Sequence, residues 1–148
     1  MSNRQNIKDK IKELLQAHLI DDLPDDAFGN KTIYAALKFD LEGQSPVVCV
    51  VPAGTEHRAL TPKGLYPIHA IDIHIFIKYA SDADDWTEED ADNELGDLAE
   101  KIGGFVAVNR VGTAWKALKY RGGSTVGLEE DIAGTSYLHE IIPLEAWN

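Results

Sequence analysis

The chain has a single cysteine among its 148 residues, so it cannot form an internal disulfide. Cys49 lies in the apolar stretch PVVCVV, and we expect a small buried residue in a reducing compartment. No apolar run approaches the ~18 residues that cross a membrane, and the first residues lack the apolar core of a secretory signal. We therefore expect a cytoplasmic protein that folds as one domain over residues 1–148.

Basic residues are scarce, since 14 Lys and Arg stand against 25 Asp and Glu and the formal net charge is −11. Ten acids and one base lie between Asp82 and Lys101, so this segment carries −9 and the rest of the chain −2. An acidic surface repels phosphates, which argues against specific nucleic-acid binding. Such a surface either keeps the protein in solution or lets DNA slide past without adhering.

Two segments repeat apolar residues at helical spacing, and they predict helices over residues 3–19 and from Thr87 to the Gly103-Gly104 pair. The apolar stripes consist of Ile7, Ile11, Leu14 and Leu15 in the first helix and Ala91, Leu95, Leu98 and Ile102 in the second. Thr87 followed by Asp90 is typical of a capping box. The other side of the second helix is acidic and includes Glu88, Glu89 and Asp92.

Alternating residues predict strands over residues 31–39, 47–51, 68–79, 113–120 and 135–147, with residues 105–111 as a strand-like lead. The first two strands are predicted to form an antiparallel hairpin. Pro143 cannot donate to a ladder, so the last strand is expected at an edge or with a bulge. The order α-β-β-β-α-β-β predicts an α+β fold, mainly an antiparallel sheet with two helices packed on one face.

Two long segments lack a period and are predicted as loops, residues 53–67 and the glycine-rich residues 121–134. Long loops in a compact domain are uncommon and tend to be functional or mobile. The first carries Glu56, His57, Arg58 and Lys63 and is locally basic in an acidic chain. It is the best candidate for a contact element.

His69, Asp72 and His74 lie within six residues, which suggests a metal site or an acid–base pair. Strand alternation separates them, because His69 shares a side with Ile71 and Ile73 whereas Asp72, His74 and Lys78 lie on the other. Zinc needs three or four ligands, and further donors would have to come from His57 or His139. We expect no metal, no cofactor and no catalytic residue here, and a polar strand face directed at solvent or a partner.

Tryptophans mark two further positions. Trp147 is next to the C-terminus, where a large aromatic residue either docks on the core or is presented to a partner. Trp86 precedes the Thr87 cap, and a hydrophobic staple at the helix entry is favoured over an interface role.

The order of segments resembles the tail terminator (minor tail protein U-like) family of long-tailed bacteriophages. The similarity lies in a lysine-rich first helix IKDKIKELLQAHL, the stretch PVVCVVPAG, a long strand HAIDIHIFIKYA that leads into the acidic helix TEEDADNELGDLAEKIGG, and the closing YRGGSTVGLEEDIAGTSYLHEIIPLEAW. It covers most of residues 3–147 and rests on order and size, without a diagnostic motif.

The resemblance implies a structural virion protein that is not an enzyme. Family members form a ring, commonly a hexamer, which caps the head-proximal end of the tail tube, ends tube polymerisation and joins the tail to the head–tail connector. Such a protein is made in the host cytoplasm, contacts no membrane, and lets DNA pass through its channel without sequence-specific binding.

Carried onto this chain, the resemblance implies subunit and tube contacts through residues 53–67 and 121–135. The candidate interface residues are Glu56, His57, Arg58, Lys63, Arg121 and Trp147. The candidate channel or partner-facing residues are Asp72, His74 and Lys78, beside the acidic helix face of Glu88, Glu89 and Asp92.

Other functions stay open. Another neck or tail-tube component belongs to the same class. A small metal-dependent hydrolase would use His57, Asp72, His74 and His139, and a binding module would use its acidic helix to mimic nucleic acid.

Overall fold

A computed structural model describes residues 3–61, 64–79 and 85–148. In chain order the elements are α1 (Asn3–His18), β1 (Ile33–Tyr34), β2 (Val47–Thr61), β3 (Gly64–Lys78), α2 (Glu88–Val108), β4 (Ala117–Tyr120), β5 (Thr125–Glu130) and β6 (Ser136–Trp147). The predicted α+β class and element order are confirmed, with β5 as a further strand inside the segment predicted as a glycine-rich loop.

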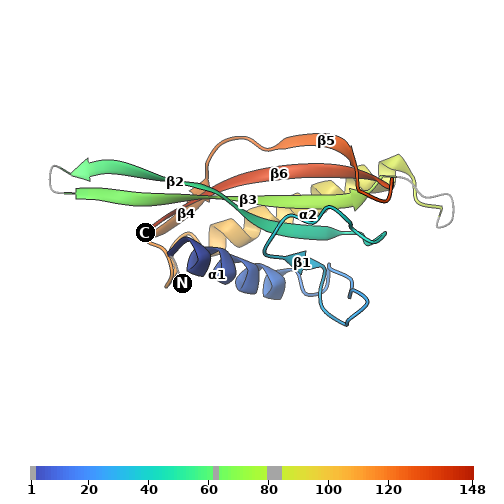
Figure 1. The fold of residues 1–148 in the computed structure, drawn as a ribbon, viewed down its shortest axis with the longest axis horizontal. Helices are drawn as coiled ribbons and strands as arrows, with labels where there is room; N and C mark the ends of the chain where they lie inside the picture. The colour runs from blue at the N-terminus through green and yellow to red at the C-terminus, as the bar shows by residue number, and fades with distance from the viewer. Residues whose placement is uncertain (1–2, 62–63, 80–84) are drawn as a thin grey trace.

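The strands form one sheet in the order β1-β2-β3-β6-β4, in which β5 also pairs with β6 (Figure 1). β4 occupies the Leu144–Trp147 half of the outer edge of β6, and β5 occupies the Ser136–Ile141 half. Every pair is antiparallel except β1 with β2. The long strands β2, β3 and β6 therefore set the length of the molecule.

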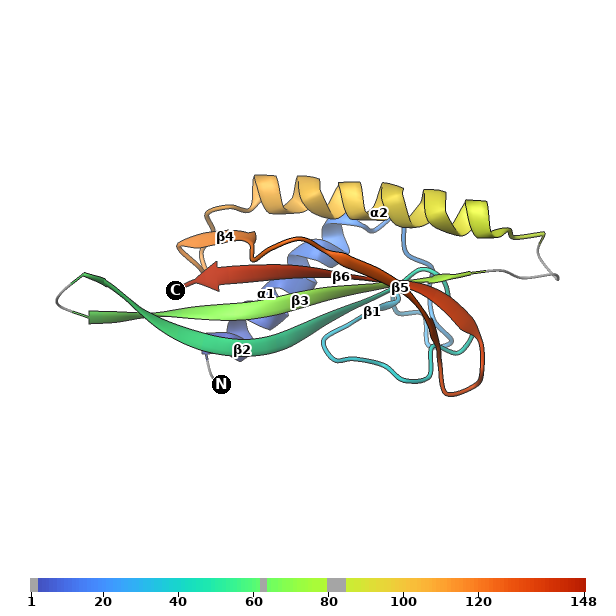
Figure 2. The ribbon, with the colours of Figure 1, turned by 90° about the horizontal axis from the view of Figure 1, so that it is seen from above.

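Both helices pack on the same face of this sheet, as predicted. Ile71, Ile73, Ile75 and Ile77 of β3 are fully buried against α1 and α2 in the main core. Figure 2 shows α2 running along the length of the sheet. Each such side chain contributes about 1.5–3 kcal/mol of hydrophobic stabilisation, so this face holds the fold together.

The second helix begins as predicted but does not end at Gly103-Gly104. Thr87 and Asp90 form a reciprocal capping box, in which the Thr87 amide donates to the Asp90 carboxylate at 2.9 Å and the Asp90 amide donates to the Thr87 hydroxyl at 3.2 Å. The helix continues to Val108, so the predicted strand-like lead at residues 105–111 is wrong. A Cβ at Gly103 would lie 3.1 Å from the Tyr120 hydroxyl, so this glycine permits close packing and does not terminate the helix.

The predicted first hairpin is also wrong. Only Ile33–Tyr34 forms a strand within residues 31–39, and it pairs with β2 in parallel. Parallel strands need a crossover of about a dozen residues, and residues 35–46 supply it by passing over the face opposite the helices. Leu41 of this connection is buried there in a second, smaller apolar cluster with Val47, Cys49, Phe76 and Tyr137.

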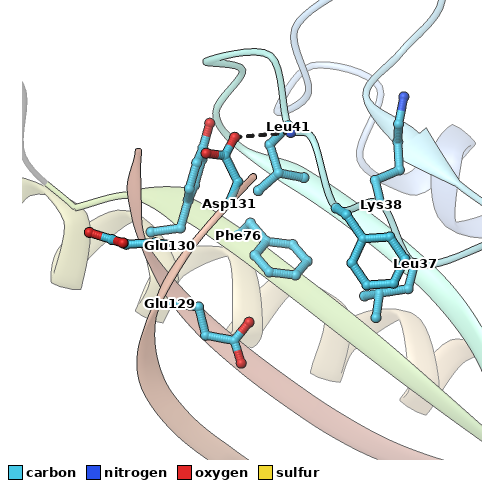
Figure 3. Close-up of a pocket in the computed structure, with 9 residues that line it drawn as sticks. Leu37, Lys38, Leu41, Phe76, Glu129, Glu130 and Asp131 are labelled. Carbon is cyan, nitrogen blue, oxygen red and sulfur yellow. Dashed lines mark hydrogen bonds between the residues drawn. The ribbon is translucent and has the colours of Figure 1, made fainter. Parts of the chain in front are cut away.

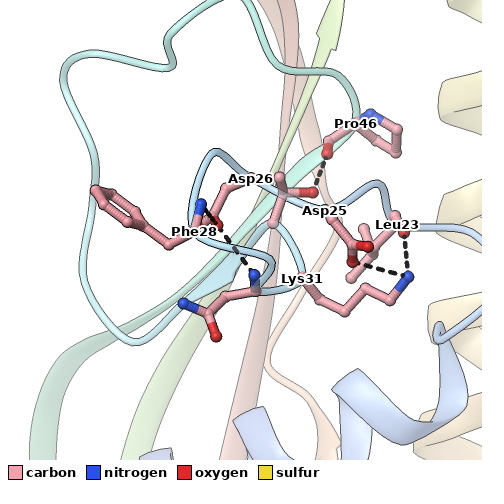
Figure 4. Close-up of polar contacts among 8 residues, drawn as sticks. Leu23, Asp25, Asp26, Phe28, Lys31 and Pro46 are labelled. Atoms are coloured by element: carbon pink, nitrogen blue, oxygen red, sulfur yellow. Dashed lines mark hydrogen bonds and ion pairs between the residues drawn. The ribbon is translucent and has the colours of Figure 1, made fainter.

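Residues 21–30 form a loop between α1 and β1 that is ordered by its own polar groups (Figure 4). The Asp26 carboxylate accepts hydrogen bonds from the amides of Phe28 and Asn30 at 2.9 and 3.0 Å. The Thr32 hydroxyl donates to the Pro46 carbonyl at 2.7 Å. These bonds fix the entry into β1 beside the start of β2.

β6 is an interior strand, which contradicts its expected place at an edge. It pairs with β3 on one side and with β4 and β5 on the other. The Pro143 carbonyl accepts from the Arg121 amide at 2.9 Å. The Pro143 nitrogen, which carries no hydrogen, therefore faces the gap between the end of β4 and the start of β5. The proline is tolerated because no ladder bond is required of its nitrogen there.

Residues 53–61 and 64–67 form strands and not the predicted loop. β2 and β3 continue through them as an antiparallel pair, whereas the pairing of β3 with β6 ends at Ile68 opposite Trp147. Residues 56–61 and 64–67, here called the hairpin arm, extend past the end of β6 as two strands (Figure 1). Lys63 lies outside the described residues, and Arg58 is described only for its backbone.

Candidate functional site: the polar face of the sheet

The face of the sheet turned away from the helices, here called the polar face, carries the polar residues of β3 and β6. Asp72 and His74 lie on it, opposite the buried isoleucines, as strand alternation predicts. His74 is only 9% exposed, however, so it does not face solvent, and the alternative that this face meets a partner stays a prediction. The rings of His139 and Phe76 pack beside it.

The central contact of the polar face joins two histidines. His74 Nδ1 and His139 Nε2 are hydrogen bonded at 2.8 Å, and the rings stack with centroids 5.0 Å apart. Phe76 stacks on His139 at 4.2 Å. His139 Nδ1 lies 3.3 Å from a Glu129 carboxylate oxygen of β5, which completes a chain across three strands.

This environment favours the uncharged form of His74 by lowering its pKa. Burial lowers the pKa of His74, the neighbouring His139 lowers it further, and the carboxylates of Asp72 and Glu129 oppose both effects to a smaller extent. A second histidine, His69, lies near the end of the opposite face, where Thr55 Oγ1 contacts its Nδ1 at 2.9 Å. Burial also lowers the pKa of His69.

A salt bridge lies next to the histidine pair. Arg121 Nη2 donates to Asp72 Oδ1 at 2.9 Å, with side chains 42% and 21% exposed. Arg121 was assigned to a candidate interface and Asp72 to a candidate channel surface, yet the structure brings them into direct contact. Both belong to one surface, the polar face.

Trp147 forms the end of the same face. Its indole nitrogen donates to Glu145 at 3.2 Å, and the Lys119 ammonium lies 4.5 Å from the ring centroid. Lys119 also pairs with Glu145 at 3.6 Å. The indole is half-buried, so it packs on its own sheet and still leaves surface for a partner.

The four proposed metal donors do not converge. His74 and His139 touch, Asp72 is bound to Arg121, and His57 is exposed on the hairpin arm. Across residues 3–61, 64–79 and 85–148, no group of three or more His, Cys, Asp or Glu is arranged to hold a metal ion. The buried Cys49 thiol, whose pKa burial raises to about 11, lies on β2 in the cluster behind Phe76.

The remaining candidates lie on α2 and at the end of β3. Glu88, Glu89 and Asp92 are exposed on α2, as predicted. Lys78 lies at the end of β3, where its carbonyl accepts from the Trp86 indole at 2.6 Å. Trp86 packs against the main core at the entry to α2, in agreement with the predicted staple position.

The contact between His74 and His139 was missed because it joins residues 65 positions apart. The available signal was the alternation in the last strand, which places Tyr137 and His139 on one side. Only the register of β6 against β3 decides whether that side meets His74.

Within the described part of the chain, neither helix combines the length and the apolar character needed to cross a lipid bilayer. No protein-family model matches the sequence, and no curated protein matches it either.

Proposed function

We propose that this chain is the structural subunit of a phage tail terminator, a ring that caps the head-proximal end of the tail tube. The hairpin arm is the observation that carries the proposal. Beyond Ile68 its two strands pair with each other and with no other strand of the described residues. An isolated two-stranded ribbon is marginal in water, so an arm of this kind is stabilised by packing on another subunit.

Open strand edges support the same conclusion. β1 pairs with β2 only at Val48 and Cys49, so the outer edge of β2 from Val50 onward has no strand partner among the described residues. β4 and β5 form the opposite edge of the sheet, and every residue of β5 is exposed. Exposed edges are templates for pairing with another chain.

The two edges differ in residues and lie on opposite sides of the sheet. A contact between unlike surfaces of identical subunits is heterologous, and it closes into a ring when the rotation between subunits permits. A ring is the assembly that a tail terminator requires. The resemblance to that family implies six subunits.

The charge distribution is compatible with a DNA channel. Glu88, Glu89 and Asp92 are exposed on α2, and the chain as a whole is strongly acidic. DNA passing such a surface would be repelled at short range. Joining to the tail tube and to the head–tail connector would then use the two rims of the ring.

Native mass spectrometry tests the proposal by comparing the wild-type chain with a variant in which the charges of Arg58 and Lys63 are reversed. We expect one discrete oligomer for the wild type and monomers for the double variant Arg58→Glu, Lys63→Glu, with melting temperatures that differ little. The matched control Lys8→Glu, Lys10→Glu reverses two charges on α1 and should leave the oligomer intact.

Monomers of the wild type at every concentration would contradict the ring. Unfolding of the arm variant would show that the arm supports the subunit and not the contact between subunits.

A further inference from the structure

A small pocket lies beside the polar face, where the crossover segment meets β5 and β6 (Figure 3). Its volume is about 90 Å³, and Leu41, Phe76 and Tyr137 contribute apolar walls. Pockets for drug-sized ligands are about 300–1,000 Å³, so this one accommodates a single short chain or side-chain end.

The walls of the pocket are held in place by long-range hydrogen bonds. The Leu41 amide donates to Asp131 Oδ2 at 3.2 Å, and the Ile132 amide donates to the Phe39 carbonyl at 2.9 Å. The other Asp131 oxygen accepts from the amides of Ala133 and Thr135 at 3.1 and 3.0 Å. Two carboxylate oxygens offer about four acceptor positions, so one remains on Asp131.

The charge around the pocket is negative. Glu129, Glu130 and Asp131 contribute to its wall, and Lys38 is the one basic residue that does. The Lys38 ammonium points away from the pocket (Figure 3) and lies 4.2 Å from the centroid of the Tyr34 ring. A cation that enters the pocket therefore meets no positive charge there.

Tyr137 supplies a second and independent sign of a ligand. Its side chain is fully buried, and its hydroxyl has no hydrogen-bond partner within the described residues. Tyr137 lines the pocket beside Glu129, Glu130 and Asp131, and burial raises the pKa of its hydroxyl to about 12. A buried hydroxyl without a partner is unfavourable by about 1–3 kcal/mol, and a ligand with N–H donors would remove that penalty.

We propose that this pocket binds a primary alkylammonium group. The ammonium donates to the Tyr137 hydroxyl oxygen and to the open acceptor of Asp131, the Glu130 carboxylate adds negative charge nearby without contacting it, and the alkyl stem packs on Leu41 and Phe76. A compact ammonium on a flexible stem fits the small volume and the apolar walls together. The exposed ring of Phe39 lies at the rim.

Two sources supply this chemistry, a lysine of a neighbouring copy and a free amine. The opposite end of the sheet carries exposed basic residues, with Lys116 and Lys119 at β4 beside Arg110. A ring in which this end of one subunit meets the pocket of the next would supply such a lysine. The site stands independently of the proposed function, whereas the lysine source depends on it.

The first experiment titrates the full chain with n-butylammonium chloride, monitored by amide NMR, with sodium chloride at equal ionic strength as reference. We expect saturable shifts at Leu41 and Asp131 with a dissociation constant on the order of millimolar. Tyr137→Phe and Glu130→Gln should each weaken binding several-fold. The control Glu88→Gln, which removes an equally exposed acid from α2, should leave the dissociation constant unchanged.

A titration with tetramethylammonium tests the role of the N–H donors, because this cation carries the charge but has no N–H group. It should bind several-fold more weakly than butylammonium. Equal binding of the two cations, shifts no larger than those caused by sodium chloride, or equal weakening by Glu88→Gln would overturn the proposed site.

The second experiment identifies the source by native mass spectrometry. If a lysine of the neighbouring copy fills the pocket, both butylammonium and Lys116→Glu should shift the oligomer toward monomers. If free amines are the ligand, the oligomer should persist in both cases. A chain that is monomeric throughout would refute the ring, and the NMR titration would still decide the pocket.

Discussion

The two faces of β3 share one backbone but differ in what covers them. One face lies under α1 and α2, and its isoleucines are fully buried in the main core. The other face lies under a crossover segment and short cross-strand contacts, and it combines a histidine pair, a salt bridge and a small apolar cluster. The first face is built for stability, and the second leaves polar groups where another molecule can reach them.

The difference follows from what each cover can exclude. The helices present continuous apolar stripes to this face, so every second residue of β3 can be apolar and buried. The crossover segment covers less of the other face. The polar groups beneath it must therefore form hydrogen bonds with one another or with water. Matched variants on the two faces test this contrast.

The largest effect is expected from matched truncations on the two faces. Ile73→Ala removes a fully buried side chain, and we expect a loss of about 2–5 kcal/mol in the free energy of unfolding. Ile141→Ala makes the same chemical change on the half-buried polar face and should cost less than half as much. Chemical denaturation of both variants measures the difference, and equal losses would contradict the contrast.

The histidine pair should make stability depend on pH. Because the pKa of folded His74 lies below its unfolded value, the unfolded chain binds protons more readily, and stability falls as the pH drops below about 6.5 toward the folded pKa. The slope for one full proton is about 1.4 kcal/mol per pH unit.

His74→Gln should reduce this slope, while His69 retains its own contribution because burial also lowers its pKa. Denaturation between pH 5 and pH 8 (about three units around the ordinary histidine pKa) measures it. An unchanged slope in the variant would show that protonation of His74 does not alter the free energy of unfolding.

Tyr137→Phe should leave the free energy of unfolding unchanged or raise it by up to about 1 kcal/mol, since the hydroxyl lacks a partner. The same substitution should weaken alkylammonium binding. Thermal unfolding without added amine measures the first effect. A loss above about 1 kcal/mol would reveal that the hydroxyl has a stabilising partner in the free protein.

The smallest effect is expected from Arg121→Ala. Its partner Asp72 is partly accessible, and salt bridges of this kind are worth about 0–1 kcal/mol. The loss should shrink further in high salt because exposed charges are screened. A loss comparable to that of Ile73→Ala would make the polar face a second centre of stability.

Local patterns predicted the parts of the fold that local interactions determine. The first helix and the Thr87–Asp90 capping box are confirmed, and so is the alternation that separates Ile73 from His74. These features depend on residues a few positions apart. They needed no knowledge of strand order.

Non-local pairing accounts for what was predicted wrongly. The hairpin arm and β5 contain glycine, proline and charged residues that favour loops, and they become strands because a partner strand lies beside them. Gly103 lies inside α2, where the absence of a Cβ leaves room for the Tyr120 hydroxyl. The place of Pro143 inside the sheet depends on the gap between β4 and β5, which no local pattern reveals.

For the candidate residues on β3, the sequence predicted which face of the strand each one lies on but not which side chains it contacts. Asp72 and His74 were placed together correctly, but their partners Arg121 and His139 follow from the register of β6 and the end of β4. The pocket at Tyr137 was not anticipated, because it is formed by segments that are distant in the chain.

The central claim is that subunits assemble through the hairpin arm into a closed ring. Negative-stain electron microscopy of the purified full chain tests it most directly. The account predicts ring-shaped class averages with rotational symmetry for the wild type, and none for the Arg58→Glu, Lys63→Glu variant. Isolated monomers or open filaments of the wild type, or rings that persist in the arm variant, would contradict it.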